Sequence, residues 1–245
     1  MNYAFNPALF KALFQTSIDD YKEYFLHEDD SDNSPDKLIV AMNQAIDVME
    51  RADSDKSVKT ENQSPLEARE VTEIGEYAQS ILAMCVTHIE TESGQQARDL
   101  MRLSIPVAVW VARQGGRVNS LEMVVNSVAG FANEIQDSAQ LTELGKVIGE
   151  VIAAVSDTIR QDLDNTNPMR PWRVINMNYC IIATRSHDTA LMEKAYDVLI
   201  KNLPHDARQF FKEGMQQMDI IGYPDEVRAV VEKYDSLWGS DSTLH

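Results

Sequence analysis

The amino-acid sequence predicts an all-α fold made of antiparallel helical hairpins, stacked as a bundle or as a short α-solenoid. Its 245 residues include only 10 glycines and 8 prolines, whereas average usage would give about 17 and about 12. Folds rich in sheet need many tight turns, so this shortage favours long helices. Half of the prolines directly follow Asn or Ser, and apolar residues recur at helical spacing between the prolines.

Proline and capping residues mark where several helices are expected to begin. A capping side chain just before a proline is the arrangement of an N-cap and the first helical position. Ser64 followed by Glu67 also has the spacing of a capping box, and Asn119 followed by Glu122 imitates one. Pro224 precedes two acidic residues, which a helix favours in its first turn. The cap–proline pairs are Asn6–Pro7, Ser34–Pro35, Ser64–Pro65 and Asn167–Pro168.

These starts and the apolar spacing together predict ten helices. The clearest apolar face belongs to the segment 138–163, where it is sustained over about five turns. We expect Pro106 to bend or to start the helix over 95–114. Val107–Val111 has the composition of a buried strand, but no partner strand is recognisable. The predicted helices cover residues 6–26, 35–52, 65–92, 95–114, 120–136, 138–163, 169–186, 188–203, 206–221 and 224–238.

Composition shifts divide the chain into a small and a large part. Residues 1–52 form a predicted N-terminal helix pair, acidic and loosely attached, because the first 70 residues carry 15 acidic and 7 basic side chains. Residues 53–64 hold a single apolar residue and are predicted to be a flexible linker. The main helical domain is then expected over 65–238, followed by a frayed tail over 239–245.

Net charge and apolar run lengths exclude several classes of partner. The net charge of -17 argues against nucleic acid, whose phosphates require a basic surface. The longest apolar run, Ile105–Ala112, is far shorter than the roughly 20 residues of a membrane helix. The first residues lack the features of a signal peptide, so we expect a cytoplasmic protein. Cys85 and Cys180 lie in apolar helical runs and are predicted to be buried thiols.

Known catalytic and phosphate-binding motifs are absent from the sequence. Gly115–Gly116 is expected to cap the end of a helix rather than to cradle a phosphate. His88 and Glu92 have the spacing of two metal ligands, but no matching pair stands elsewhere, so they indicate a polar helix end. We therefore predict no catalytic, cofactor-binding or metal-binding residue, and no cofactor.

Two further patterns allow two interpretations each. Gly145, Gly149 and Ala153 predict the close approach of another helix, either from the same chain or from a second copy in a homodimer formed through the Leu141–Leu163 helix. The methionines of the last third fit either an adaptable binding groove or ordinary helical core. These methionines include Met169, Met177, Met192, Met215 and Met218.

An aromatic residue, a proline, a small residue, a second aromatic residue and a glycine follow one another at Tyr196, Pro204, Ala207, Phe210 and Gly214. This junction resembles the join between two tetratricopeptide repeats. An aromatic residue and a proline close one repeat of that family, and a small residue, an aromatic residue and a glycine open the next. The resemblance covers about 20 residues, and no 34-residue period continues through the chain. It implies a stack of helical hairpins whose usual task is to bind other proteins.

The segment 167–179, together with Arg185 and His187 near the far end of the same helix, is the predicted recognition surface. It places two arginines and a tryptophan at a helix start in an acidic protein, and Arg and Trp are enriched at binding hot spots. Alternatively, the tryptophan packs in the core and the arginines pair with carboxylates. The candidate residues are Arg170, Trp172, Arg173, Asn176, Tyr179, Arg185 and His187.

These features predict a non-enzymatic, cytoplasmic protein–protein interaction module. A helical domain that binds a small anionic ligand through Arg170 and Arg173 is the alternative, and an enzyme of an unfamiliar all-α type is the third possibility. A neutral or basic protein partner suits the acidic composition best, with neither nucleic acid nor membrane as partner.

Overall fold

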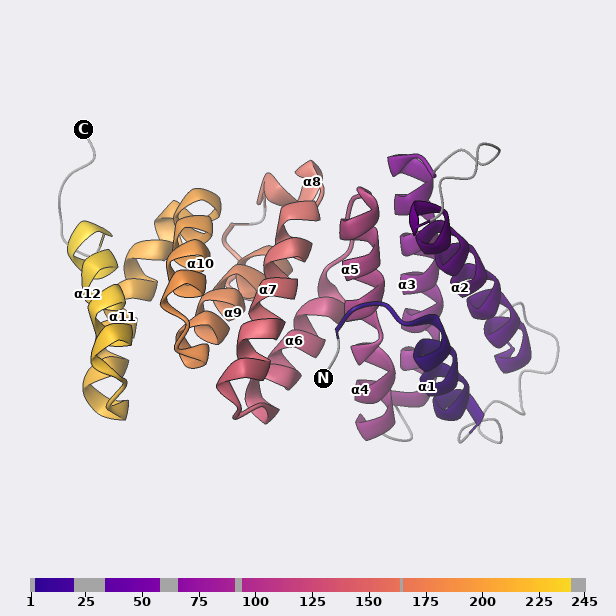
Figure 1. The fold of residues 1–245 in the computed structure, drawn as a ribbon, viewed down its shortest axis with the longest axis horizontal. Coiled ribbons are helices and arrows are strands. Elements are labelled where there is room, and N and C mark those ends of the chain that lie inside the picture. The colour runs from indigo at the N-terminus through magenta and orange to yellow at the C-terminus, as the bar shows by residue number, and fades with distance from the viewer. Residues whose placement is uncertain (1–2, 20–33, 58–65, 91–93, 164, 239–245) are drawn as a thin grey trace. The chain divides into compact units, whose positions relative to one another are not determined.

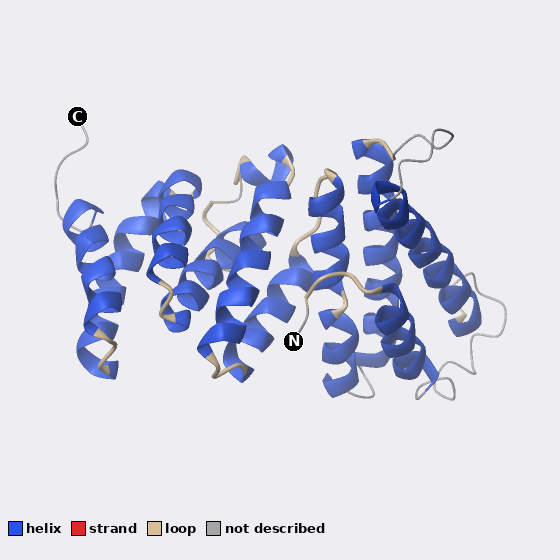
Figure 2. Cartoon of the chain, in the orientation of Figure 1, coloured by secondary structure: helices blue, strands red, loops and turns tan. Residues whose placement is uncertain are grey.

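The computed structural model describes residues 3–19, 34–57, 66–90, 94–163 and 165–238. Within these ranges the chain forms twelve helices and no β-strand (Figures 1 and 2). The predicted all-α class is therefore confirmed. An isolated parallel bridge between Val118 and Val155 is the one β-type contact of the described residues.

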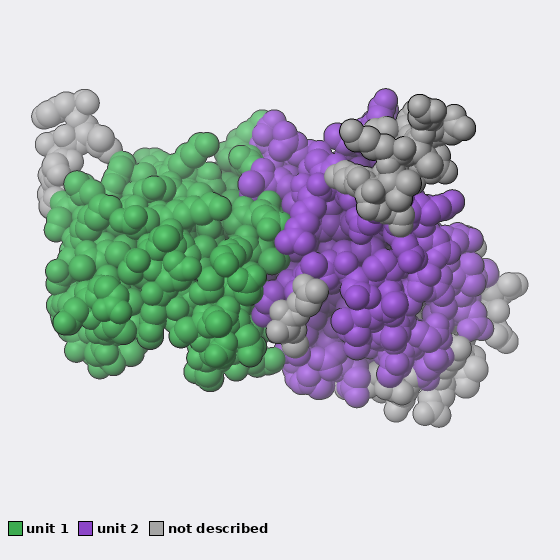
Figure 3. Space-filling model, in the orientation of Figure 1, with its two compact units in different colours: residues 1, 129–152, 159–245 green, residues 2–128, 153–158 purple. Residues whose placement is uncertain are grey.

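The chain divides into two compact units (Figure 3). Unit 2 comprises residues 2–128 and 153–158, and unit 1 comprises residue 1 with 129–152 and 159–245. In unit 2, helix α3 packs against α2, α4 and α5. Its helices are α1 (Pro7–Asp19), α2 (Pro35–Ser57), α3 (Ala68–Glu90), α4 (Gly94–Arg102), α5 (Ser104–Gln114) and the first part of α6 (Glu122–Glu134).

Unit 1 contains two successive helical hairpins, α9 with α10 and α11 with α12. Helix α10 also packs against α11 and α12, so one continuous core joins the four helices. The helices of this unit are the end of α6 from Ala129, α7 (Ser138–Ala154) as far as Ile152, the second half of α8 (Asp157–Arg160), α9 (Pro171–Ser186), α10 (Thr189–Asn202), α11 (Pro204–Ile221) and α12 (Asp225–Trp238).

The sequence predicts some helix starts correctly and misplaces others. The side chain of Asn6 accepts a hydrogen bond from the Leu9 N–H at 3.0 Å, as expected for an N-cap. Helix α3 begins later than predicted, and Glu70 Oε2 accepts from the backbone N–H of Glu67 at 2.8 Å. Asn119 does not cap α6, because its amide donates to Glu76 Oε1 at 2.6 Å instead.

Asn167 was also expected to cap a helix, and this prediction is wrong. Its side chain accepts from the Met169 N–H at 2.9 Å, and its carbonyl accepts from the Arg170 N–H at 3.3 Å. These bonds form a tight turn ahead of α9 rather than its first turn. Helix α9 begins at Pro171 instead, which occupies the first helical turn.

Two of the predicted helices are each divided in two. The segment 95–114 breaks at Leu103, and Pro106 lies in the first turn of α5, where its missing N–H costs no helical hydrogen bond. In the segment 138–163 the regular helix ends at Ala154. It ends there because the Val118 N–H donates a hydrogen bond to the Ala154 carbonyl, and the Ser156 N–H donates one to the Val118 carbonyl, both at 3.0 Å. The chain then forms the short helix α8.

The boundaries of the units differ from the predicted domains. Helix α2 continues through residues 53–57, the first part of the predicted linker, and it packs against α3 within one compact unit. The rest of that linker, the tail 239–245 and the residue Glu92 lie outside the described residues, as does the side chain of His88. Both cysteines are free and buried, as expected.

Candidate functional site

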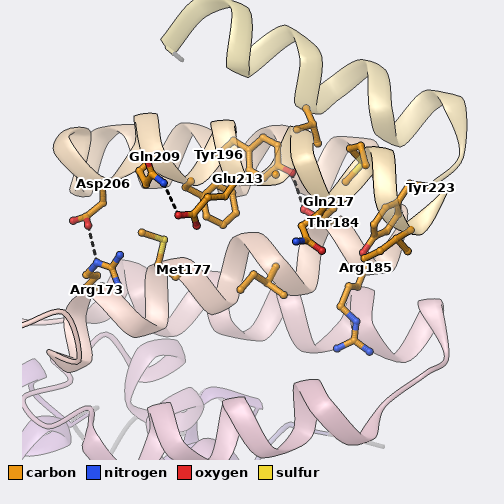
Figure 4. Close-up of a pocket in the computed structure, with 16 residues that line it drawn as sticks. Arg173, Met177, Thr184, Arg185, Tyr196, Asp206, Gln209, Glu213, Gln217 and Tyr223 are labelled. Atoms are coloured by element: carbon orange, nitrogen blue, oxygen red, sulfur yellow. Dashed lines mark hydrogen bonds and ion pairs between the residues drawn. The ribbon is translucent and has the colours of Figure 1, made fainter. Parts of the chain in front are cut away.

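Unit 1 has a concave site between α9 and α11, a groove with a volume of about 490 Å³ (Figure 4). This volume is within the range of roughly 300–1,000 Å³ that is usual for ligand pockets. The two helices run parallel, because Arg173 meets Asp206 near the start of both helices and Arg185 lies beside Tyr223 near their ends. The wall from Arg173 to Arg185 is about 18 Å long at the helical rise of 1.5 Å per residue. We call this site the α9–α11 groove.

The α9 wall is a stripe of residues spaced four apart along the helix. Arg173, Met177 and Ile181 face the groove, whereas Ile175, one of the residues between them, is fully buried on the opposite face. Ile181 keeps 43% of its surface exposed. Apolar side chains that stay exposed along a groove leave surface that a ligand can cover.

The α11 wall mixes polar and apolar side chains. Gln209, Glu213 and Gln217 follow one another at four-residue spacing, and the Gln209 amide donates to Glu213 Oε1 at 2.5 Å. Phe210 and Ile221 add apolar surface to this wall, and 58% of Ile221 is exposed. A ligand in the groove therefore meets amides and a carboxylate on one side and apolar atoms on both.

A buried aromatic cluster supports the α11 wall from behind. The ring of Tyr196 packs edge-on against Phe210, Phe211 and Tyr234, with ring centroids 5.1 to 5.9 Å apart. Its hydroxyl lies 2.7 Å from the hydroxyl of Thr184, and burial raises the pKa of Tyr196 well above its ordinary value. The cluster fixes the distance between α10 and the two helices that follow it.

An ionic cluster closes the end of the groove where both helices start. Arg173 Nε donates to Asp206 Oδ1 at 2.6 Å, and Arg170 donates to Asp206 Oδ2 at 3.1 Å. Arg170 also binds both carboxylate oxygens of Asp162, at 2.5 and 2.8 Å. The hydrogen bond to Asp162 is the main cause that raises the pKa of Arg170. Two positive and two negative groups are thus paired, and the cluster is neutral.

The other end of the groove leads to a small polar pocket of about 250 Å³. Arg185, Ile221 and Tyr223 line both cavities. The guanidinium of Arg185 donates to the carbonyls of Ala132 and Ile135, the latter at 2.9 Å, and so caps the end of α6. His187 ends α9 in a left-handed conformation, with φ of 59°, and its ring packs edge-on against Tyr223.

The seven residues of the predicted recognition surface do not form one surface. Arg170, Trp172, Asn176 and Tyr179 are buried, because they belong to the face of α9 and its preceding turn that packs into unit 1. Only Arg173 and Arg185 line the α9–α11 groove, and His187 lies in the adjoining polar pocket. The arginines near the start of α9 are paired with carboxylates, as the alternative interpretation expected.

The methionines divide between the two roles considered for them. Met177 and Met218 line the groove, and Met192 is fully buried in the core. Sequence reasoning missed Gln209, Phe210, Glu213 and Ile221. The four-residue spacing of Gln209, Glu213 and Gln217 was the available signal, although exposed polar residues at that spacing are common on helices.

The small residues of α7 meet helices of their own unit. A Cβ at Gly145 would lie 2.8 Å from Leu191 Cδ2, and one at Gly149 would lie 2.8 Å from the hydroxyl of Tyr179. This face of α7 is therefore occupied within the chain by α9 and α10. The interpretation that placed the approaching helix in the same chain accounts for both glycines.

No protein-family model, no curated protein and no solved structure matches the chain. In the part of the chain that the structure describes, every helix is too short or too polar to cross a membrane.

Proposed function

We propose that the protein is a non-enzymatic, cytoplasmic protein–protein interaction module, and that the α9–α11 groove binds a short segment of another protein. The observation that carries this proposal is the exposed apolar lining of a pocket-sized groove. Ile181 and Ile221 line this cavity of about 490 Å³, and 43% and 58% of their surfaces are exposed to solvent. Covering such side chains provides a hydrophobic gain on binding.

The packing of the repeat-like junction supports this proposal. Ala207 is fully buried, and Tyr196 packs against Phe210 with ring centroids 5.9 Å apart. At Gly214 a Cβ would lie 3.3 Å from Val231, so the glycine allows the close approach of α12. We infer that α9–α10 and α11–α12 are two hairpins similar to tetratricopeptide repeats. In this chain the first helices of the two hairpins, α9 and α11, run parallel and line the groove.

The contacts of Arg170 and Arg173 weigh against the alternative of a small anionic ligand. An anion would have to compete with Asp162 and Asp206, which already bind both guanidinium groups. Displacing a buried partner leaves an unpaired charge, and this is costly. A protein segment that covers the apolar stripe requires no such exchange.

Two isoleucines allow a matched test of this proposal. Ile181 lines the groove, whereas Ile220 is 75% exposed and does not line it. Partners are first captured from host extract by the full chain, and overlapping synthetic peptides from each partner are then titrated. We expect Ile181→Asp to weaken peptide binding by at least about tenfold, as for a hot-spot residue, and Ile220→Asp to bind as wild type.

Both substitutions replace exposed side chains, so the melting temperatures of the two variants should match that of the wild type. Equal binding of the wild type, Ile181→Asp and Ile220→Asp would place the binding site elsewhere and overturn the proposal.

A further inference from the structure

We propose that the segment bound in the α9–α11 groove is basic as well as apolar, and that one of its lysine or arginine side chains pairs with Glu213. This inference rests on the proposed function, since it specifies the chemistry of the partner at the same groove. It follows from the charges of the groove and from the environment of one carboxylate.

The groove has four charged lining residues, and three of them are already engaged. Arg173 and Asp206 bind each other at 2.6 Å, and Arg170 adds a second cation to Asp206. The guanidinium of Arg185 binds two backbone carbonyls of α6 and points away from the groove (Figure 4). None of these groups offers a free charge to a ligand.

Glu213 differs from the other three. Its carboxylate accepts one hydrogen bond from the neutral amide of Gln209, and no cationic side chain of the described residues pairs with it. A carboxylate has about four lone-pair sites, so most of its accepting capacity remains open. The residue is exposed and stands midway along the α11 wall (Figure 4).

The surroundings of Glu213 suit the side chain of a lysine or arginine. Met177 and Ile181 line the groove from the facing helix, and Phe210 lines it from α11, about one turn before Glu213. The aliphatic stem of a lysine can lie over such apolar atoms while its ammonium group reaches a carboxylate. Once a bound segment covers the groove and excludes water, this carboxylate attracts a cation more strongly than a carboxylate on an open surface does.

The charge of the whole chain acts in the same direction. A net charge of -17 attracts basic segments and repels acidic ones before contact is made. Charge complementarity therefore favours a basic, apolar segment over an acidic one for this groove.

The experiment uses a defined set of fluorescein-labelled synthetic peptides and the full chain. Each peptide carries four leucines at helical spacing and a single lysine, which is moved through the remaining serine and glutamine positions. Matched peptides carry glutamine or glutamate in place of the lysine. Binding is measured by fluorescence polarisation at low and at high salt.

We expect the best lysine peptide to bind the wild type about fivefold more tightly than its glutamine counterpart, and high salt to reduce this preference. Glu213→Gln should abolish the preference and leave the affinity for the glutamine peptide unchanged. Glu213→Lys should transfer the preference to the glutamate peptide. The control Glu143→Gln, at an exposed carboxylate paired with Lys146 outside the groove, should retain the wild-type preference.

The outcomes separate this inference from the proposed function. A lysine preference that survives in Glu213→Gln would overturn the role of Glu213, and an absent preference would overturn the basic partner. In both cases the proposed groove would stand if Ile181→Asp still weakened the binding of the glutamine peptide. Two outcomes would overturn the proposed function and this inference together. In the first, Ile181→Asp binds the peptides as tightly as the wild type does, and in the second, no peptide binds at all.

Discussion

The hydroxyl oxygen of Tyr179 lies against Gly149, so closely that a Cβ on this residue would be 2.8 Å away. Tyr179 is on α9 and Gly149 is on α7, and the contact brings the two helices together within unit 1. The hydroxyl is buried, and no hydrogen-bond partner lies within reach in the described structure. Burial raises the pKa of Tyr179 to about 12, so the phenol is neutral at physiological pH.

This contact predicts that Gly149→Ala destabilises the protein. The new methyl group must displace a buried aromatic side chain, and overpacking typically costs about 1–3 kcal/mol, whereas the helix gains only about 1 kcal/mol from alanine. We expect the free energy of unfolding in urea to fall by about 1 kcal/mol. In the control Gly130→Ala, a Cβ would meet no atom within 4 Å, so this variant should be more stable than the wild type.

Tyr179→Phe tests the same contact from the other side. Removing a buried hydroxyl without a partner should raise the free energy of unfolding by about 1 kcal/mol. In this background Gly149→Ala should cost less, because the nearest remaining ring atom, Cζ, would be 3.2 Å from the Cβ. If the two changes in the free energy of unfolding simply add in the double variant, the hydroxyl does not limit the approach of α7 to α9.

Arg170→Ala is predicted to destabilise unit 1 strongly. Only 9% of the Arg170 side chain and 16% of the Asp162 side chain are exposed. Truncation leaves Asp162 with an uncompensated, largely buried charge, and the expected loss is about 3 kcal/mol in urea unfolding. Lys146→Ala, which breaks an exposed pair with Glu143, should leave the melting temperature unchanged. A similar small effect in both variants would contradict a structural role for Arg170.

Stability is predicted to decline above about pH 9 partly through Cys85. Burial raises the pKa of this thiol from its ordinary value of 9.0 to about 12 in the folded protein. The unfolded chain therefore loses the proton first, and the contribution is complete below pH 9 and lost as the pH rises towards 12. Each ionising group of this kind lowers the free energy of unfolding by about 1.4 kcal/mol per pH unit.

The measurement is a series of urea unfolding curves from pH 7 to pH 11 for the wild type and Cys85→Ala. Above pH 9 the free energy of unfolding should fall less steeply with pH in the variant than in the wild type. Part of the fall remains in the variant, because burial also raises the pKa values of Cys180 and of buried tyrosines such as Tyr196. Parallel curves for the two proteins would show that Cys85 ionises equally easily in the folded and unfolded states.

Local signals in the sequence predict most of the helices and, through Pro106, an interruption of the segment 95–114, but not the break within 138–163. Asn6 and Pro7 specify a helix start through contacts within one turn, and the structure shows that start. The end of α7 depends on Val118, which pairs with the chain near Val155 from far away in the sequence. A contact of this kind leaves no local pattern, and neither proline nor glycine marks the break.

The candidate site was harder to predict, because burial decides the role of each residue. An aromatic residue such as Trp172 or Tyr179 looks the same in the sequence whether it anchors a ligand or fills a core. In the structure both residues fill the core. Asp206 and Arg173 are 33 positions apart in the sequence, so no local pattern identifies Asp206 as the partner of this arginine. The groove itself combines faces of α9 and α11, two helices that α10 separates in the chain.

The ion pair between Arg173 and Asp206 gives the groove a blocked end. It joins one wall to the other where both helices start, and the described walls carry no such bridge farther along the groove, beside Ile181 and Ile221. A segment bound as proposed would therefore have to stop at this pair or rise out of the groove there. The distance from the pair to Glu213 would then determine how many residues separate the first buried side chain of that segment from its cationic one.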